Sequence, residues 1–365
     1  MHERPLRVFY NASALPPRPA GAGVYTLELG RALAAQPGID VVAAAPEPYA
    51  FGGETRRPKP AGRGRQGWEM VALSGVLARS GADVYHGPHF FVPHTVVPAV
   101  ATVHDLTFYR LPGRYSFAHR RYYRYLARCA KRAARIIAPS GAVAADIVRF
   151  LGYPPERIRV IAEAPRAGLA PATEPEVARL RGELALEAPY LLCLGTAEPG
   201  KRAVDAIRAM PAILEQAPGT VLALAGNPGR LSPALEREVA RLSVGYAVRF
   251  LGYIPDESLA ALLSGATALV FPSLFEGFGL PPLEAMACGT PVISTDAPAM
   301  SEVLAGTATL APRRGPPASA GAAPPPLGGP PPRAGRSARG IEFASRFSWQ
   351  RTAEETIDVY REVAP

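Results

Sequence analysis

Two carboxylates with a short turn between them are the first residues in this sequence that could carry chemistry. Glu276 and Glu284 bracket the segment EGFGLPPLE, which contains two glycines and two prolines and follows an apolar run. The glycines allow unusual backbone angles and a close approach of a ligand, and the paired prolines favour the first turn of a helix. We therefore expect a helix to begin inside this segment, with the turn as a binding site.

The backbone N–H groups of Phe278, Gly279 and Leu280 would then point outward at the start of a helix. Such a start binds anions or hydroxyls, because its N–H groups lack partners within the helix. A carboxylate only accepts hydrogen bonds, and its two oxygens suit neighbouring hydroxyls of a ribose or a hexose. With Glu284 for one polyol and Glu276 for another, the segment suits a nucleotide sugar. The plainer interpretation is a simple glycine turn and a glutamate that favours a helix start.

The elements that would position these residues are strands and helices in two successive series. The first series of apolar runs comprises LRVFY (6–10), IDVVAAA (39–45), DVYHG (83–87), AVATVHD (99–105), RIIAPS (135–140) and RIRVIAE (157–163). The second comprises YLLCLGT (190–196), TVLALAG (220–226), VRFLGY (248–253), ALVFPS (268–273) and PVISTD (291–296). Apolar strands separated by amphipathic helices indicate parallel sheets covered on both faces. The predicted fold class is α/β, with two doubly wound domains that bind ligands at the carboxyl ends of the strands.

Length and composition also indicate two domains. A chain of 365 residues exceeds what one core usually serves. Pro and Gly accumulate in EAPRAGLAPATEPE (163–176), where we place the join. The start of the chain lacks the apolar stretch of a signal peptide, and no apolar run reaches the roughly 20 residues that span a bilayer. The three cysteines lie far apart in apolar surroundings, which is typical of reduced thiols in a cytoplasmic protein.

Two stretches depart from the alternation of strands and helices. Residues 53–67 read as an exposed, flexible loop. Residues 313–340 are rich in Pro and Gly and hold no acidic or aromatic residue, so we expect an irregular segment that cannot bury enough apolar surface to order itself. An amphipathic helix then follows, with Ser348 as its N-cap. Its expected buried face comprises Trp349, Ala353, Thr356, Ile357 and Tyr360.

The net charge of +9 is carried almost entirely by arginine, since the chain has only three lysines. Part of this excess resembles the amino-acid bias of a GC-rich genome, and we infer no nucleic-acid partner from it. The strongest basic helix is expected in RYSFAHRRYYRYLARCAKRAARII (114–137), with Tyr122, Leu126, Cys129, Ala133 and Ile137 on one face and five basic residues opposite. A solvated basic face is the favoured interpretation, and docking to an anionic membrane stays open.

The segment FPSLFEGFGLPPLEAMACGTPVISTD (271–296) resembles the Glu-x7-Glu signature of the retaining GT-B glycosyltransferases of family 4. Other segments extend the likeness to the bacterial mannosyltransferase-like branch, including GAGVYTLELGRAL (21–33), DVYHGPHFFVP (83–93), ATVHDLTFYRLP (101–112), LLCLGTAEPGKR (191–202) and FSWQRTAEETIDVYREV (347–363). The resemblance implies two Rossmann-like domains with a cleft between them. An acceptor-side domain of residues 1–165 would be completed by the helix at 347–363, and residues 166–346 would bind the nucleotide sugar.

The resemblance also implies roles for individual residues of the second domain. Glu284 would bind the nucleotide ribose, and Glu276 would hold hydroxyls of the transferred sugar, assisted by the amides of residues 278–280. Lys201 would neutralise the diphosphate leaving group, because breaking a sugar–diphosphate bond develops negative charge there. With a protein cation in that place, the reaction needs no metal ion. The family branch usually has Arg where this chain has Gly200, so the grip on the diphosphate is expected to be weaker.

In the first domain, the resemblance implies that Gly21 and Gly23 form a loop that approaches the same phosphates. His104 would lie near the reacting sugar, with Asp105 beside it. His104 could instead be a buried histidine with structural partners at a strand end. Three further histidines, in HGPHFFVPH (86–94), lack both helical spacing and neighbouring cysteines, so no metal site is expected.

The function implied by the resemblance is transfer of a hexose, such as mannose, with retention of configuration. The donor would be a GDP- or UDP-linked sugar and the acceptor a glycan or a lipid-linked molecule, with no cofactor. The protein would act in the cytoplasm, with peripheral contact with the inner membrane surface left open. Two alternatives remain: a nucleotide-sugar-binding protein with little or no turnover, and a nucleotide-sugar epimerase of the same fold. A glycoside hydrolase would need one carboxyl with a raised pKa near a water-accessible sugar, which nothing in the sequence indicates.

Overall fold

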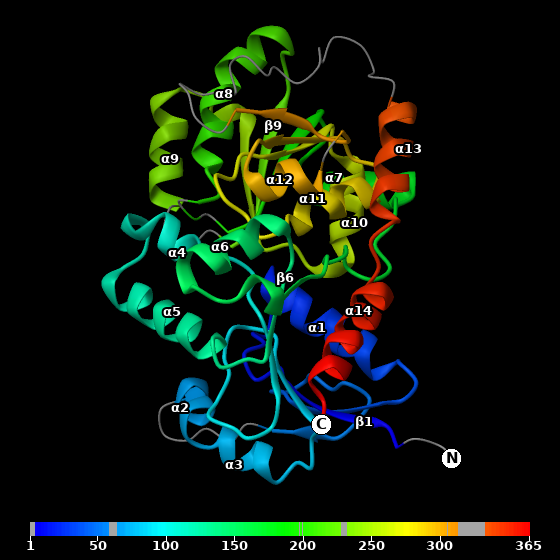
Figure 1. The fold of residues 1–365 in the computed structure, drawn as a ribbon. Coiled ribbons are helices and arrows are strands. Elements are labelled where there is room, and N and C mark those ends of the chain that lie inside the picture. The colour runs from blue at the N-terminus through cyan, green and yellow to red at the C-terminus, as the bar shows by residue number, and fades with distance from the viewer. Residues whose placement is uncertain are drawn as a thin grey trace. The chain divides into compact units, whose positions relative to one another are not determined.

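The computed structural model describes residues 4–57, 64–196, 198, 200–227, 232–304, 306–312 and 333–365. By its internal contacts the chain divides into two compact units. Unit 1 comprises Met1–Ala167 and Phe347–Pro365, and unit 2 comprises Gly168–Arg346 (Figure 1). Each unit is built on its own parallel sheet flanked by helices, which confirms the predicted α/β class.

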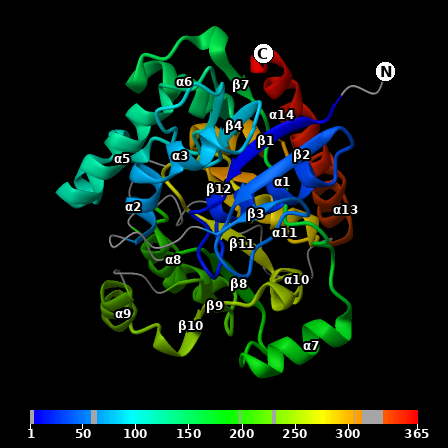
Figure 2. The ribbon, with the colours of Figure 1, turned by 90° about the horizontal axis from the view of Figure 1, so that it is seen from below.

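The sheet of unit 1 has seven strands over the described residues, in the order β3-β2-β1-β4-β5-β6-β7. Figure 2 labels β1, β2, β3, β4 and β7 of this sheet. The strands are β1 (Leu6–Asn11), β2 (Ile39–Ala44), β3 (Thr55–Arg56), β4 (Val84–Gly87), β5 (Ala99–Thr102), β6 (Arg135–Ala138) and β7 (Ile158–Val160). The helices are α1 (Ala22–Ala34), α2 (Gly64–Val71), α3 (Leu73–Ala78), α4 (Thr107–Arg110), α5 (Phe117–Ala130), α6 (Gly141–Leu151) and α14 (Trp349–Val363).

Both faces of this sheet are buried, which explains why its strands read as continuous apolar runs. Along β1, Val8 and Tyr10 pack in a core formed with α1 and α14, while Phe9 packs in a second core formed with α2, α3, α5 and α6. Successive side chains of a strand point to opposite faces, so a single strand supplies both cores.

The last helix, α14, begins at the predicted residue and buries the predicted face. Ser348 caps it by accepting a hydrogen bond from the N–H of Arg351, and the five residues expected to be buried all are. The indole N–H of Trp349 donates to the carbonyl of Pro165, and α14 packs beside α1 (Figure 1). The end of the chain thus completes the core of unit 1.

The sheet of unit 2 has the order β10-β9-β8-β11-β12-β13 in the part of the chain that is described. Its strands are β8 (Tyr190–Leu194), β9 (Val221–Ala225), β10 (Val248–Gly252), β11 (Ala268–Phe271), β12 (Val292–Thr295) and β13 (Thr309–Ala311). Its helices are α7 (Glu174–Glu183), α8 (Ala203–Gln216), α9 (Ser232–Arg241), α10 (Asp256–Gly265), α11 (Leu280–Ala287), α12 (Pro298–Val303) and α13 (Arg333–Ala344). All eleven strands predicted from the sequence are present.

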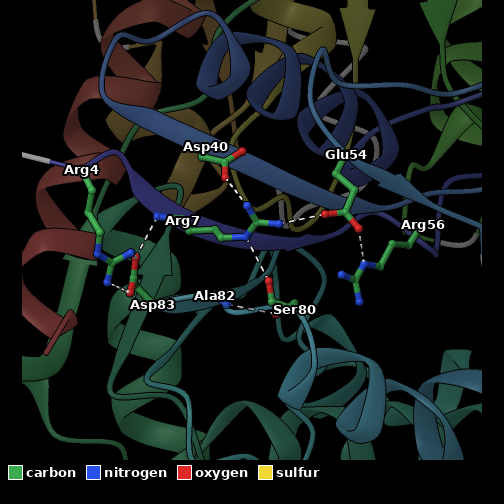
Figure 3. A network of polar contacts seen from close by, with 8 residues as sticks. All are labelled: Arg4, Arg7, Asp40, Glu54, Arg56, Ser80, Ala82 and Asp83. Atoms are coloured by element: carbon green, nitrogen blue, oxygen red, sulfur yellow. Dashed lines mark hydrogen bonds and ion pairs between the residues drawn. The ribbon is translucent and has the colours of Figure 1, made fainter.

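The prediction of a flexible loop over residues 53–67 was wrong at both ends of that segment. Glu54 and Arg56 accept backbone hydrogen bonds from β2, which makes β3 an edge strand, and residues 64–67 belong to α2. Arg7 of β1 donates to Asp40 (2.6 Å) and Glu54 (2.8 Å), and Glu54 in turn accepts from Arg56 (Figure 3). These ion pairs explain why so polar a segment joins the sheet. Residues 58–63 lie outside the described residues.

The irregular segment expected at 313–340 was also partly wrong, because α13 begins at Arg333. The stretch RAGRSARG (333–340) contains no proline, and alanine and arginine are good helix formers. Helix α13 packs on α11, where a Cβ on Gly340 would lie 3.6 Å from Met286. This contact supplies the apolar burial that the segment alone lacks. Residues 313–332 are outside the described part of the chain.

The basic helix is shorter than the expected 114–137. Helix α5 ends at Ala130, and strand β6 begins at Arg135 and pairs with β5 and β7. Ile137 therefore packs in the core that contains α1 and α14, while Leu126 packs in the other. Apolar residues keep the helical spacing through the turn between α5 and β6, so the spacing did not indicate where the helix ends. No helix among the described residues is long and apolar enough to cross a membrane.

Candidate donor site

The start of α11 has the geometry expected from its sequence. The strand β11 ends at Phe271, a short loop follows, and the helix begins at Leu280 with both prolines in its first turn. Gly279 has φ 106°, and an added Cβ would lie 2.5 Å from Cε of Met300. Any other residue would be strained there by its backbone angle and crowded by a neighbour. The glycine therefore sets the path of the chain into the helix.

Glu284 lies in the second turn of α11 and is only 1% exposed. Its negative charge acts on the nearby Cys288: burial, and then the charge of Glu284, raise the pKa of that thiol to about 12. A carboxylate removed from water to this extent is costly unless polar groups compensate it. Glu284 lies one turn beyond the start of the helix, where Phe278 and Leu280 are 4% and 6% exposed.

Lys201 and Glu276 are 75 residues apart and form an ion pair, with 2.6 Å between Nζ and Oε1. The ammonium also lies 5.2 Å from the ring centroid of Phe271, at the end of β11. The N–H of Leu274 donates to the carbonyl of Gly200 (3.0 Å), which fastens the loop after β8 to the loop after β11. The fold thus brings together Gly200, Lys201 and Glu276 as the sequence predicted. With side chains 30% and 13% exposed, the pair is partly accessible to a ligand.

In unit 1, Gly21 precedes α1 with φ 52°. The N–H of Gly23 donates to the carbonyl of Ala20 (3.0 Å), and a Cβ on Gly23 would lie 3.2 Å from Cβ of Pro19. A side chain at Gly23 would thus be crowded by Pro19, and the amide of Gly23 already has a partner within the turn.

His104 and Asp105 follow β5 at the carboxyl edge of the same sheet. Nδ1 of His104 lies 3.0 Å from Oε1 of Glu163, and Nε2 lies 2.8 Å from the carbonyl of Pro88. Oδ1 of Asp105 accepts the N–H of Thr107 (2.8 Å) and so closes the turn into α4. Both ring nitrogens of His104 therefore contact protein atoms.

Glu163 was not singled out by the sequence reasoning, although a signal was present. It directly follows the apolar run of β7, and residues at the carboxyl ends of parallel strands are those that line sites. Nothing in the sequence connected it with His104, 59 residues earlier. The contact depends on β7 and β5 lying in one sheet with β6 between them.

The three histidines of the segment 86–94 do not gather into a metal centre. Nδ1 of His86 contacts the hydroxyl of Tyr360 (2.5 Å) and Nε2 contacts Oγ1 of Thr102 (2.9 Å), so both ring nitrogens have protein partners. Burial, followed by the charge of His104, lowers the pKa of His86 to about 3. His86 is therefore a neutral structural residue that links α14 to β5.

Two family models and several curated proteins match this chain. Residues 178–311 match the family described as "Glycosyl transferases group 1", and residues 19–163 match "Glycosyltransferase Family 4". The O-antigen chain mannosyltransferase B of Escherichia coli is 32% identical over 282 residues, which are 76% of this chain and 74% of that protein. Glycogen synthase of Mycobacterium tuberculosis is 30% identical over 350 residues, which are 88% of this chain and 80% of that protein.

Solved structures share the fold over nearly the whole chain. Sucrose-phosphate synthase from Thermosynechococcus elongatus has a TM-score of 0.80 at 22% identity, covering 99% of both chains. HepE from Anabaena, solved with UDP and glucose, has a TM-score of 0.76 at 18% identity, covering 98% of this chain and 100% of that one. Together with the two relatives in sequence, these likenesses show that the chain belongs to the family 4 glycosyltransferases and has their GT-B fold.

Proposed function

We propose that this glycosyltransferase moves a hexose, such as mannose, from a GDP- or UDP-linked sugar to a glycan or lipid-linked acceptor, with retention and without a metal ion. The observation that carries the proposal is the grouping of Lys201, Glu276 and Glu284 around the start of α11. Relatives named as mannosyltransferases and a structural neighbour solved with UDP-glucose support the substrate class.

The roles follow from the charges that develop during transfer. When the bond between sugar and diphosphate breaks, the phosphate gains negative charge, and the Lys201 ammonium with the helix-start amides would stabilise it. Lys201 is paired with Glu276 in the structure, so the arriving diphosphate would share the ammonium with that carboxylate. Glu276 would accept hydroxyls of the hexose, and Glu284 those of the ribose. Gly21 and Gly23, and His104 with Asp105, keep the roles that the family resemblance implies.

Substitution of Glu284 and of Glu276 is expected to affect different quantities, namely nucleotide affinity and kcat. Glu284→Ala should weaken binding of GDP or UDP by about tenfold or more, because a ribose hydroxyl pair would lose a charged acceptor. Glu276→Ala should leave nucleotide affinity within about threefold and lower kcat instead, because its partner is the sugar. Isothermal titration with the nucleotides and initial rates with a panel of GDP- and UDP-sugars measure the two effects. Glu257→Ala on α10, an exposed carboxylate, is the matched control.

Unchanged affinity and unchanged rates in both variants would refute the assignment of the donor site. Nucleotide binding without turnover, across the donor panel and with varied acceptors, would refute the proposed transfer and favour a binding protein. NMR of the glycosidic product distinguishes retention from inversion. Rates that persist in excess EDTA are expected, because Lys201 would take the place of a metal cation.

We also propose that α5 makes the peripheral contact with a membrane. The helix carries four arginines and no acidic residue, and Phe117 at its start is 65% exposed. Arg120 and Arg121 lie 5.8 and 5.7 Å from the Phe117 ring centroid, so cations and an apolar side chain share one end of the helix. Such a combination suits the anionic headgroup region.

Vesicle sedimentation tests this contact. Phosphatidylglycerol vesicles should retain the protein at low salt, and phosphatidylcholine vesicles should not. The pair of substitutions Arg121→Gln and Arg128→Gln should reduce binding about thirtyfold, since two basic residues near an anionic surface together contribute about 2 kcal/mol. The control is the pair Arg351→Gln and Arg361→Gln on α14, which removes the same amount of charge from another helix. An equal loss of vesicle binding in both double variants would contradict a role specific to α5.

A further inference from the structure

Three loops at the carboxyl edge of the unit 1 sheet meet at the side chain of His104. His104 follows β5, Pro88 follows β4, and Glu163 follows β7. The two ring nitrogens are 3.0 Å from the Glu163 carboxylate and 2.8 Å from the Pro88 carbonyl. His104 is 8% exposed and Glu163 is 5% exposed, so water competes little for either contact. In such surroundings a hydrogen bond between charged groups is strong and directional.

Both partners of the ring are acceptors, and this determines where the protons are. A peptide carbonyl and a carboxylate carry no hydrogen, so each ring nitrogen must donate, which only the imidazolium can do. Burial disfavours the charged ring, but the hydrogen bond and the charge of Glu163 outweigh it, and the pKa of His104 is raised.

The other groups that face His104 are compatible with a cation there. Asp105 adds negative charge beside it. From α1, the ring of Tyr25 meets the imidazole edge-on at 4.7 Å. From β4 and the loop after it, His86 is neutral because its pKa is about 3, and the ring centroid of His89 is 6.2 Å away. The carboxylate of Glu163 is thus the main counter-charge that faces the ring.

We propose that Glu163 is a positioning residue of the transferase, which holds His104 as a buried imidazolium with both nitrogens turned to protein partners rather than to sugar hydroxyls. His104 then contributes by its fixed charge and by joining the loops after β4, β5 and β7 at the reacting edge. The inference about catalysis rests on the proposed function, whereas the protonation state of His104 can be measured without any substrate.

The first experiment observes the histidine itself. In the full-length protein without ligand, two-dimensional ¹⁵N NMR of the imidazoles should show both nitrogens of His104 protonated at neutral pH and above. The signal is assigned through its contact with the Tyr25 ring. In Glu163→Gln the carboxamide keeps the shape without the charge, and His104 should lose a proton at lower pH than in the unaltered protein. A neutral His104 at pH 7 in the unaltered protein would overturn the proposal.

The second experiment is a pH profile of kcat/KM. Glu163→Gln should shift the alkaline limb of the profile to lower pH and cost about ten- to hundredfold in rate at pH 8, since a displaced loop edge misaligns the reactants. Lowering the pH should restore much of the rate, because the histidine is then protonated again. Affinity for GDP or UDP alone should stay within about threefold, since Glu163 contacts none of the residues proposed to bind the nucleotide.

Glu156→Gln is the matched control, because it makes the same chemical change on an exposed carboxyl seven residues earlier. It should leave both the imidazole spectrum and the pH profile unchanged. A uniform loss of rate in Glu163→Gln, with no change in the position of the alkaline limb, would show a merely structural role and refute the inference. If no donor supports transfer at all, the proposed function fails, and the NMR measurement still decides the state of His104.

Discussion

At the scale of single residues, the proposed donor site has Lys201 as its cation, where the family resemblance implies an arginine beside the lysine. Lys201 is held 2.6 Å from Glu276, and the residue before it, Gly200, contributes only its carbonyl to the contact with Leu274. Glycine at this position leaves the loop free of a second positive side chain. The consequence should be a modest affinity for the diphosphate, which substitution can test.

Gly200→Arg should therefore tighten binding of the donor. A second cation near a diphosphate is expected to contribute about 1 kcal/mol in a partly exposed loop, or roughly fivefold in Kd. Titration calorimetry with GDP and UDP measures the change, and the gain should shrink at high salt. Ala178→Arg, on the exposed face of α7, adds the same charge away from the site. An equal gain in that control would mean that only the net charge matters.

At the scale of elements, the sequence of α11 sets a precise start for the helix. Two prolines are tolerated because their positions need no helical N–H, and Gly279 takes a backbone angle that other residues avoid. The helix is then covered by α12, whose Met300 lies against Gly279, and by α13, whose Gly340 lies against Met286. The start of this short helix is thus held by packing against both neighbouring helices.

Gly279→Ala should loosen this start. Strain at φ 106° costs about 1–2 kcal/mol, and the new methyl must displace the end of Met300, 2.5 Å away. Gly219→Ala is the control, because Gly219 has φ 84° and open space around it. In Gly279→Ala, but not in Gly219→Ala, peptides from α11 should exchange hydrogen faster and the Kd for the nucleotide should rise. Equal exchange rates in the two variants would mean that the contact with Met300 does not hold the start of α11.

At the scale of the whole molecule, two buried histidines of unit 1 titrate in opposite directions. His104 is stabilised as a cation, so its contribution to stability is present below its ordinary pKa near 6.5 and is lost as the pH rises through the raised value. His86 is stabilised as a neutral ring with a pKa near 3. Its contribution is present above about 6.5 and is lost as the pH falls toward 3, because only the unfolded chain then binds the proton.

The acid side of this dependence is a specific prediction. Between pH 6.5 and 3, His86 should lower the free energy of unfolding by up to about 1.4 kcal/mol per pH unit. Both tryptophans, Trp68 and Trp349, lie in unit 1, so their fluorescence in urea reports this unit. His86→Gln should flatten the slope, and His119→Gln on the exposed side of α5 should retain it. A slope that persists in His86→Gln would contradict the assignment.

The sequence alone predicted most of what depends on local patterns. Apolar runs bounded by polar turns identified all eleven of the expected strands, because parallel strands buried on both faces are continuously apolar. It missed the two-residue strand β3 and the edge strand β13, which are too short or too polar to show a pattern. It extended the basic helix through a turn, because apolar spacing alone does not show where a helix ends.

The turn and the helix start at residues 276–284 were also predictable from the sequence, since the glycines and prolines there determine both. The tertiary structure alone decided which charges meet. Lys201 reaches Glu276 because β8 and β11 are neighbours, and His104 reaches Glu163 because β5 and β7 end at the same edge of one sheet. Spacing along the chain encodes local geometry, whereas the order of strands in a sheet brings distant side chains together. That order is the physical reason why the imidazolium and its carboxylate could not be found from the sequence.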